Sequence, residues 1–257
     1  MTELVGDSGA VGEPYSAGGS APSVRRTVVN SPGASAYRTP VLAAMARRRS
    51  VAKVGSKAPD DRELLTLLRS VVTVADHDAL RPWRLLTLRG DDRVRLGTAL
   101  DAAAGTQRAP GESNLKPLRA ELLVAIIASQ VDHPKVPHWE QVATAAGAGH
   151  LLSLALSEAG WGVMWRSGVH TNAQPVRELH GVADDERLMG WLYVGDVDPS
   201  FARRSATSSR PVPDPTAFLG SLPPADGTTS RMAARSQTAD GSQMTDRSRM
   251  TDSPMPR

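Results

Sequence analysis

The stretch LLVAIIA, from Leu122 to Ala128, is uniformly apolar and rich in branched side chains. A short run of this composition predicts a buried strand rather than a surface helix. It is far shorter than the ~20 residues that cross a bilayer, and no other apolar run approaches that length. We therefore expect a fold built around this strand, in a protein without membrane partners.

Helix and strand signals alternate irregularly on either side of this strand. Helices are expected to begin at Pro40, at Asp60 or Asp61 as N-cap, at Asp91 as N-cap and running through Leu100, at His138 and running to Ala159, and at Pro175. Further strands are expected over residues 83–89, 163–165 and 188–194. Because helices and strands mix without a strict βαβ alternation, the pattern favours an α+β fold.

The two ends of the chain differ in composition from its middle. Residues 1–38 and 221–257 are rich in small and polar residues, so we predict a disordered N-terminal segment and a disordered C-terminal tail around one folded domain, residues 39–220. The 257 residues contain no cysteine, which excludes disulfides and thiolate chemistry and fits a cytoplasmic protein. The net charge of +3 is too small to indicate a nucleic-acid binder.

The common catalytic and cofactor motifs are missing from the sequence. No GxxxxGK[ST] loop and no GxSxG elbow occur, and the six histidines show no metal-ligand spacing, so no metal site is expected. Three segments instead combine basic, hydroxyl and aromatic residues: Arg47–Ser50, Asp76–Trp83 and Trp161–Gly168. Each alone is typical of a solvated face or of a core, but together they fit a site for a large, flat, phosphorylated ligand.

These segments belong to an ordered series of motifs. The series reads RRS at residues 48–50, DHDALRPW at 76–83, KVPHWEQ at 135–141, GWGVMWRSG at 160–168, VRELHGV at 176–182, LMGWLYVGD at 188–196 and PVPDP at 211–215. In this order it resembles the FMN-dependent nitroreductase family, in its branch of small NAD(P)H nitroreductases, over roughly residues 41–219. The resemblance implies a nitroreductase-like α+β fold with a central, mostly antiparallel sheet flanked by helices. It also implies an intertwined homodimer with an FMN at each of two interface sites.

The resemblance further implies which residues bind FMN. Arg48, Arg49 and Ser50 match contacts to the flavin and its phosphate, and Trp165, Arg166 and Ser167 match an element beside the flavin. His77 matches a histidine that the partner subunit supplies. Arg203 or Arg204 would complete the phosphate site, and residues 155–160 match a stretch near the nicotinamide donor. Arg47 is expected to face solvent.

The sequence departs from the family pattern at several positions of this site. Thr73 stands where relatives often carry an arginine, and the residues that follow RRS are Val51, Ala52 and Lys53. Losing a cationic partner for phosphate costs about 1.5–3 kcal/mol, or one to two orders of magnitude in affinity. Weaker FMN binding is therefore expected, although the remaining arginines should suffice.

The leading hypothesis is an FMN-dependent oxidoreductase. It would use NADH or NADPH to reduce a small-molecule acceptor, such as a nitroaromatic or a quinone, by ping-pong hydride transfer. No catalytic side chain is expected, because the flavin carries the chemistry. The alternative is a flavin-binding or degenerate, non-catalytic family member that acts by sequestration or through partners. Nucleic-acid binding through Arg47–Arg49 ranks far lower, because no aromatic residues accompany the run.

Overall fold

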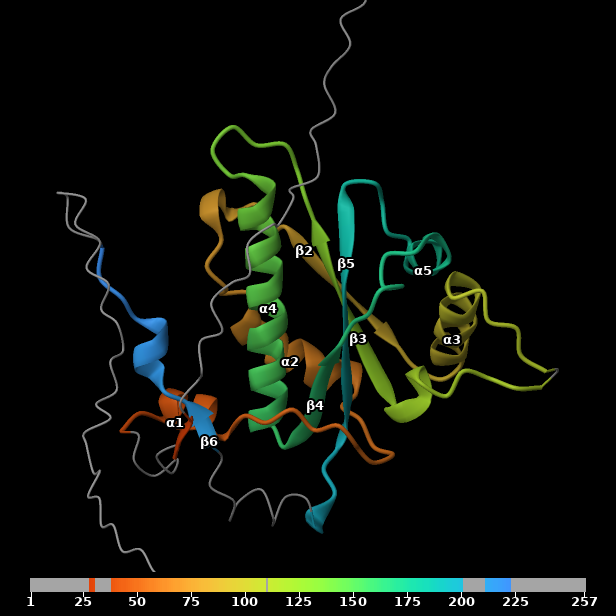
Figure 1. Cartoon of the computed structure of the whole chain (residues 1–257), viewed down its shortest axis with the longest axis horizontal. Coiled ribbons are helices and arrows are strands. Elements are labelled where there is room, and N and C mark those ends of the chain that lie inside the picture. The colour runs from red at the N-terminus through yellow and green to blue at the C-terminus, as the bar shows by residue number, and fades with distance from the viewer. Residues whose placement is uncertain (1–27, 31–37, 110, 201–210, 223–257) are drawn as a thin grey trace, which may run out of the picture. The chain divides into compact units, whose positions relative to one another are not determined.

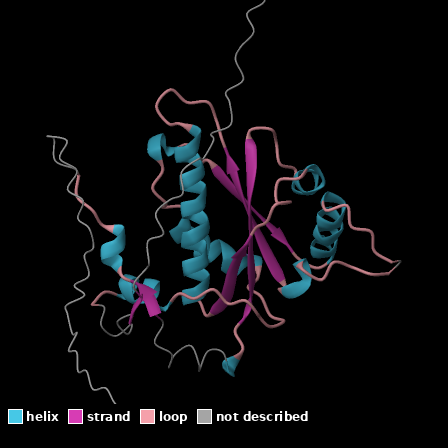
Figure 2. Ribbon diagram, in the orientation of Figure 1, coloured by secondary structure: helices cyan, strands magenta, loops and turns pink. Residues whose placement is uncertain are grey.

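A computed structural model describes residues 28–30, 38–109, 111–200 and 211–222 (Figures 1 and 2). The chain divides into two compact units, residues 28–212 and a second unit that combines residues 1–27 with residues 213–257. The described part of the second unit contains the short 3-10 helix Pro215–Phe218. The site elements described below belong to the first unit.

The predicted helices and strands are present in the predicted order, and two short strands, the first and the last of those described, were not predicted. The helices are α1 (Pro40–Arg47), α2 (Asp61–Val71), α3 (Asp91–Ala103), α4 (His138–Glu158) and α5 (Gln174–His180), with 3-10 turns at His77–Ala79 and Pro117–Arg119. The strands are β1 (Val28–Asn30), β2 (Trp83–Leu88), β3 (Leu122–Ser129), β4 (Trp161–Arg166), β5 (Glu186–Asp196) and β6 (Pro211–Pro213). Strand β1 lies inside the segment predicted to be disordered, and the rest of residues 1–37 and residues 223–257 lie outside the described residues.

The main sheet has the strand order β2-β3-β5-β4, and each neighbouring pair is antiparallel. LLVAIIA forms β3, which has a neighbouring strand on both edges. Its residues Leu122 to Ala128 are at most 1% exposed. The strand predicted from apolar composition is therefore confirmed.

Side chains of β3 point alternately into two apolar cores. Leu122, Val124 and Ile126 pack with residues of α2 and α4 on one face of the sheet. Leu123, Ala125 and Ile127 pack with residues of α3 and α5 on the other face. Figure 1 shows the resulting arrangement, with α4 on one side of the sheet and α3 and α5 on the other. The α+β class and the antiparallel sheet flanked by helices are both confirmed.

The sequence predicts an aspartate as the N-cap of both α2 and α3, and the structure confirms only one of the two. The Asp60 side chain accepts a hydrogen bond from Glu63 N at 2.8 Å and caps α2, as predicted. The cap predicted for α3 is wrong, because Gly90 is its N-cap, with φ 46°, and Asp91 is already helical. Asp91 instead lies in the first turn, where the positive end of the helix dipole stabilises a carboxylate. The helix also runs past Leu100 to Ala103.

Strand β5 contains a bulge that faces the end of β4. The register with β3 shifts between Ile126 and Ile127, so that Met189 has no partner residue on β3. The next residue, Gly190, has φ +116°, and a Cβ there would lie 2.4 Å from the carbonyl oxygen of Arg166. Only glycine fits this position without displacing the chain that follows β4.

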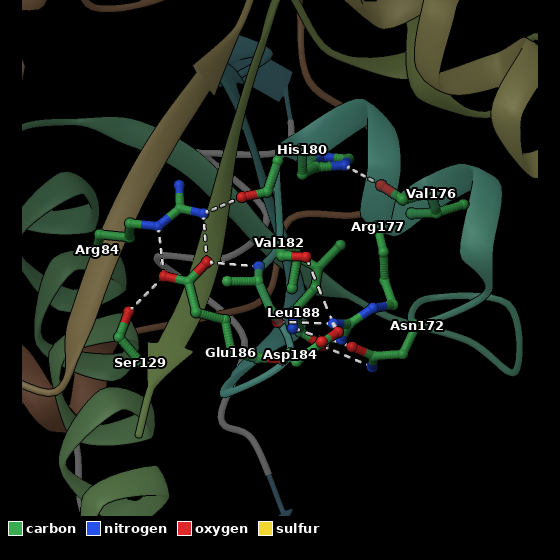
Figure 3. A network of polar contacts seen from close by, with 12 residues as sticks. Arg84, Ser129, Asn172, Val176, Arg177, His180, Val182, Asp184, Glu186 and Leu188 are labelled. Carbon is green, nitrogen blue, oxygen red and sulfur yellow. Dashed lines mark hydrogen bonds and ion pairs between the residues drawn. The ribbon is translucent and has the colours of Figure 1, made fainter. Parts of the chain in front are cut away.

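A polar network joins the beginning of β2, the end of β3 and the beginning of β5 (Figure 3). The Arg84 guanidinium of β2 donates to both oxygens of Glu186 on β5, at 2.7 and 2.6 Å. The Ser129 hydroxyl of β3 donates to the same carboxylate at 2.7 Å. Hydrogen bonds from Arg84 are the main reason that the pKa of Glu186 falls from its usual 4.5 to about 2. The network therefore ties three strands together through one ionised carboxylate.

Replacement of Glu186 by glutamine should lower stability in a pH-dependent way. The folded state keeps Glu186 ionised to about pH 2, whereas the unfolded chain takes up a proton near pH 4.5. The contribution of the pair is therefore complete above pH 4.5 and is lost as the pH falls from about 4.5 to about 2. At neutral pH, Glu186→Gln should reduce the free energy of unfolding by about 2 kcal/mol, allowing for the partly exposed Arg84.

Thermal unfolding of both proteins between pH 7 and pH 2 measures this difference. Glu178→Gln is the matched control. Among the described residues, the Glu178 carboxylate accepts only from the neutral Gln174 amide, so this variant should show no comparable loss of stability. A difference between wild type and Glu186→Gln that stays constant over the whole pH range would contradict the assignment.

Gly190→Ala should destabilise the protein more than alanine at another glycine of positive φ. Gly160 has φ +91°, but a Cβ there meets no described atom within 4 Å. Gly160→Ala should therefore cost only backbone strain, about 1–2 kcal/mol. Gly190→Ala adds the collision with Arg166 and should cost roughly 3 kcal/mol or more. Urea unfolding of the two variants measures the difference, and equal costs would argue against the close approach at Gly190.

Candidate functional site

The residues after α1 form a strap along the edge of the sheet. Helix α1 ends at Arg47, and Arg48 is its C-cap in a non-helical conformation. The strap begins where Val51 N donates to Val163 O of β4 at 2.9 Å, and it continues where Gly55 N donates to Asp196 O of β5 at 2.8 Å. These hydrogen bonds place Arg48, Arg49 and Ser50 beside the outer strand of the sheet.

Two glycines of the sheet allow the strap to approach so closely. A Cβ added to Gly162 of β4 or to Gly195 of β5 would lie 2.8 Å from a methyl group of Val54. Gly55 in turn faces the Asp196 carboxylate, which accepts from Lys57 N at 2.8 Å. The position of the RRS residues thus depends on small residues in three separate segments.

Arg166, at the end of β4, reaches the strap. Its Nη2 donates to Ala52 O at 3.2 Å, so the RRS motif lies next to the WRS motif (residues 165–167) in one chain. Its guanidinium carbon is 5.3 Å from the centre of the Tyr193 ring, and burial raises the pKa of that tyrosine. Arg166 Nε is buried and has no hydrogen-bond partner among the described residues. An unpaired buried donor is costly, so Arg166 Nε is available to an acceptor on a ligand, although Arg93 Nε, away from this site, is also buried and unpaired among the described residues.

Trp165 is held in one orientation by contacts on several sides. Its indole Nε1 donates to Met189 O in the bulge at 3.1 Å. Its benzene edge covers Gly149 of α4, where an added Cβ would lie 2.8 Å away. The His150 ring lies 5.0 Å from the Trp165 ring, centre to centre. The half-buried indole is therefore a rigid plate that packs against α4, on the face of β4 opposite to the Arg166 side chain.

The neighbouring arginines of the RRS motif have different surroundings. Arg47 is exposed, as expected, and its Nη2 also donates to Glu158 Oε2 at 2.7 Å, a contact that the sequence did not indicate. Arg48 and Arg49 are half-buried and Ser50 is exposed. Arg47 therefore anchors α1 to the end of α4, while the next residues turn toward the strap.

His77 lies at the other end of α4. Its Nδ1 is 3.0 Å from Glu140 Oε1 in the first turn of this helix. Trp165 packs on the same helix at Gly149, nine residues further along, which corresponds to roughly 14 Å of helix. Within a single chain, the RRS and WRS motifs therefore lie next to each other, and His77 lies apart from both.

Thr73 lies in the same part of the chain as His77. It is exposed, and its hydroxyl donates to Ser70 O at 2.7 Å. The residues after His77 are strained, because Asp78, Ala79 and Arg81 all have positive φ. A hydrogen bond from Arg81 N to Asp76 Oδ2, at 2.7 Å, closes this loop.

The two arginines predicted to complete the phosphate site, Arg203 and Arg204, fall in residues 201–210, which are not among the described residues. Within the described residues, no group of three or more histidine or acidic side chains could hold a metal ion. Among their helices, none is long and apolar enough to span a bilayer.

The sequence did not indicate three residues that shape the site. Gly190 makes room for the WRS turn, Tyr193 lies under Arg166, and Glu140 holds His77. The glycine inside an otherwise apolar strand was the available signal for the bulge. Tyr193 and Glu140 join residues distant in the sequence, and no local pattern marks such contacts.

The donors gathered here suit an anionic, flat ligand. Arg48, Arg49, Arg166 and two serines offer hydrogen bonds, and Arg166 Nε meets no acceptor in the described part of the chain. Guanidinium groups match phosphate and planar polar edges. The residues present therefore fit a phosphorylated ring system.

Known proteins resemble the chain in sequence. The model of the nitroreductase family matches residues 45–196, more than half of the chain. A protein of Escherichia coli K12, named "Putative NAD(P)H nitroreductase YdjA", is 31% identical over 182 residues, which cover 69% of this chain and 97% of that protein. A Haemophilus influenzae protein named "Putative NAD(P)H nitroreductase" is 27% identical over 161 residues, which cover 60% and 86%.

Solved structures resemble it in fold. A nitroreductase-like family protein from Bacillus cereus has a TM-score of 0.59 at 20% identity, covering 72% of this chain and 97% of that chain. A mutant of NfnB from "sphigopyxis sp. strain HMH", titled an FMN and NADPH-dependent nitroreductase, has a TM-score of 0.54 at 17% identity, covering 69% and 96%. These similarities confirm the predicted nitroreductase-like fold. The family model and the Escherichia coli relative establish that the chain belongs to the nitroreductase family.

Proposed function

We propose that the protein is an FMN-dependent oxidoreductase that takes electrons from NADH or NADPH and delivers them to a small-molecule acceptor, such as a nitroaromatic or a quinone. Family membership and the names of its curated relatives support this proposal. The observation that carries it is the unpaired Arg166 Nε, among the described residues, beside the strap that presents Arg48, Arg49 and Ser50. A phosphorylated flavin offers acceptors for all of these donors.

The side chains bind and orient in this proposal, and none acts as an acid or base. Arg48 and Arg49 would neutralise the phosphate, and Ser50, Arg166 and Ser167 would donate to the flavin ring. The Trp165 plate would limit water access on one side, because its contacts leave it a single orientation. The chemistry supplied by bound FMN is hydride transfer between NAD(P)H and the acceptor, in alternating ping-pong steps.

A second copy of the chain would complete each site. His77 is held at Glu140, at the far end of α4 from Trp165. The family resemblance implies that His77 contacts the flavin of another subunit. We therefore propose a homodimer with two shared sites, as the resemblance implies. The cytoplasm stays the expected compartment, because the acceptor and NAD(P)H are proposed to be soluble small molecules.

Thr73 is the observation that favours the alternative of a non-catalytic flavin binder. The Thr73 hydroxyl is bonded within its own helix end and adds no positive charge. In that case FMN would bind but would not be reduced by NAD(P)H.

FMN reconstitution of the full chain tests the main proposal. After removal of free FMN, the protein should retain flavin stoichiometrically, and anaerobic NADH or NADPH should bleach the visible spectrum. Retained flavin that neither nucleotide bleaches would favour the non-catalytic alternative, and no retained flavin would sink both. Arg48→Ala should raise the Kd for FMN about 10- to 100-fold, the effect of losing 1.5–3 kcal/mol. Arg47→Ala is the control, because Arg47 pairs with Glu158, and its Kd should stay close to wild type.

Mixing two variants with damaged FMN sites tests the shared site. Arg48→Ala and His77→Ala each damage both sites of their own homodimer. In a mixed dimer, one site combines both lesions, whereas the other has an intact RRS motif and an intact His77. Co-expression with two affinity tags should therefore yield heterodimers that retain one FMN each. Heterodimers that bind no better than either homodimer would show that His77 and Arg48 do not share a site across subunits.

A further inference from the structure

The first residues of β5 extend beyond the end of β4. Arg166, the last residue of β4, pairs with Trp191, so the residues of β5 before Gly190 have β3 on one edge and no described strand on the other. Side chains form hydrogen bonds to the backbone of β5 at this edge, where a neighbouring strand would otherwise do so (Figure 3). Arg177 Nη1 of α5 donates to Glu186 O at 3.0 Å, and Asn172 meets Leu188.

Asn172 pairs with Leu188 as a peptide group would. Its Nδ2 donates to Leu188 O at 2.8 Å, and its Oδ1 accepts from Leu188 N at 3.0 Å. A primary amide has a donor and an acceptor on one plane, so it can close both halves of a strand-like pair. Asn172 is exposed as a residue, but both of these hydrogen bonds are partly buried.

The pair lies directly next to the residues that hold Trp165. Leu188 precedes the bulge, whose Met189 carbonyl accepts the Trp165 indole hydrogen. Gly190 follows, against the carbonyl of Arg166. A shift of Leu188 would therefore move the acceptor of the indole and the surface under the WRS turn together.

The chain also connects Asn172 to the WRS motif from the other side. After Ser167, the chain makes a turn in which Gly168 N donates to Thr171 Oγ1 at 2.8 Å and Thr171 N donates to Gly168 O at 3.1 Å. Thr171 is buried, and Asn172 is the next residue. The segment 165–172 is thus a closed loop, fixed at one end by the bulge and at the other by Asn172.

We propose that Asn172 is a positioning residue for Trp165, Arg166 and Ser167. By closing the edge of β5 just before the bulge, its amide fixes the indole of Trp165 and the turn that carries Ser167. The consequence for FMN rests on the proposed function, in which these residues face the flavin. Asn172 itself touches no proposed ligand atom and acts through Leu188 and the turn.

Other contacts hold α5 without reaching this loop. Trp191 Nε1 donates to His180 Nε2 at 3.0 Å, and Arg177 binds the carbonyls of Ala183 and Glu186. These contacts anchor the helix and the chain before β5. They keep α5 in place when Asn172 is replaced, so that the loss is confined to the edge beside the bulge.

The experiment compares Asn172→Ala with Asn114→Ala. Asn114 is a buried amide with the same double role, donating to Asp101 Oδ1 at 2.7 Å and accepting from Lys116 N at 3.1 Å, in the loop after α3. Hydrogen exchange of the Trp165 indole N–H is followed by NMR in the flavin-free protein, with the signal assigned from Trp165→Phe. The Kd for FMN and the thermal unfolding temperature are measured for the same proteins.

Asn172→Ala should speed exchange of the Trp165 indole about tenfold and weaken FMN binding several-fold, the scale of one or two lost hydrogen bonds. Asn114→Ala should lower thermal stability and leave both readouts unchanged. Thr171→Val, which removes the acceptor for Gly168 N, provides a second variant if Asn172→Ala does not fold, and it should speed the same exchange.

Two results would overturn the proposal. One is an indole exchange rate in Asn172→Ala equal to that of wild type, whatever its thermal stability. The other is faster exchange with an unchanged Kd for FMN. If the wild-type protein binds no FMN, the proposed function fails, but the exchange measurement on the flavin-free protein still decides whether Asn172 positions Trp165.

Discussion

The burial of β3 on both faces is the constraint on which the rest of the structure depends. Every residue of LLVAIIA is at most 1% exposed, so each face of the sheet needs a cover of its own. Helices α2 and α4 supply one cover, and α3 and α5 supply the other. Burial of apolar surface at this density drives folding, and it places α4 directly against the strand that carries Trp165.

Close approaches of backbone build the candidate site on this scaffold. The strap lies on Gly162 and Gly195, and the WRS turn lies on Gly190. At each place a side chain as small as a methyl group would collide with a neighbour. The same lack of side chains that lowers local strand propensity therefore brings RRS and WRS together. The site is rigid because both motifs end in hydrogen bonds to the sheet rather than in free loops.

Helix α4 holds His77 apart from the RRS and WRS motifs, although the family resemblance assigns all three to FMN binding. Arg47 is bound at its last turn, Trp165 near its middle and His77 at its first turn. Along this helix of 21 residues, His77 and Trp165 are held roughly 14 Å apart. The proposed second subunit rests on the family resemblance, which assigns His77 to the site of the partner.

Local patterns in the sequence determined much of the fold. The apolar run predicted β3, Asp60 predicted the start of α2, and the ordered motifs indicated the nitroreductase family. Tertiary structure alone decided the Asn172–Leu188 pair, the Arg47–Glu158 ion pair and the separation of His77 from Trp165. Periodicity and capping act between residues a few positions apart, so they can be recognised in a sequence. Contacts such as Arg166 with Ala52, 114 residues apart, exist only once packing has fixed which surfaces meet.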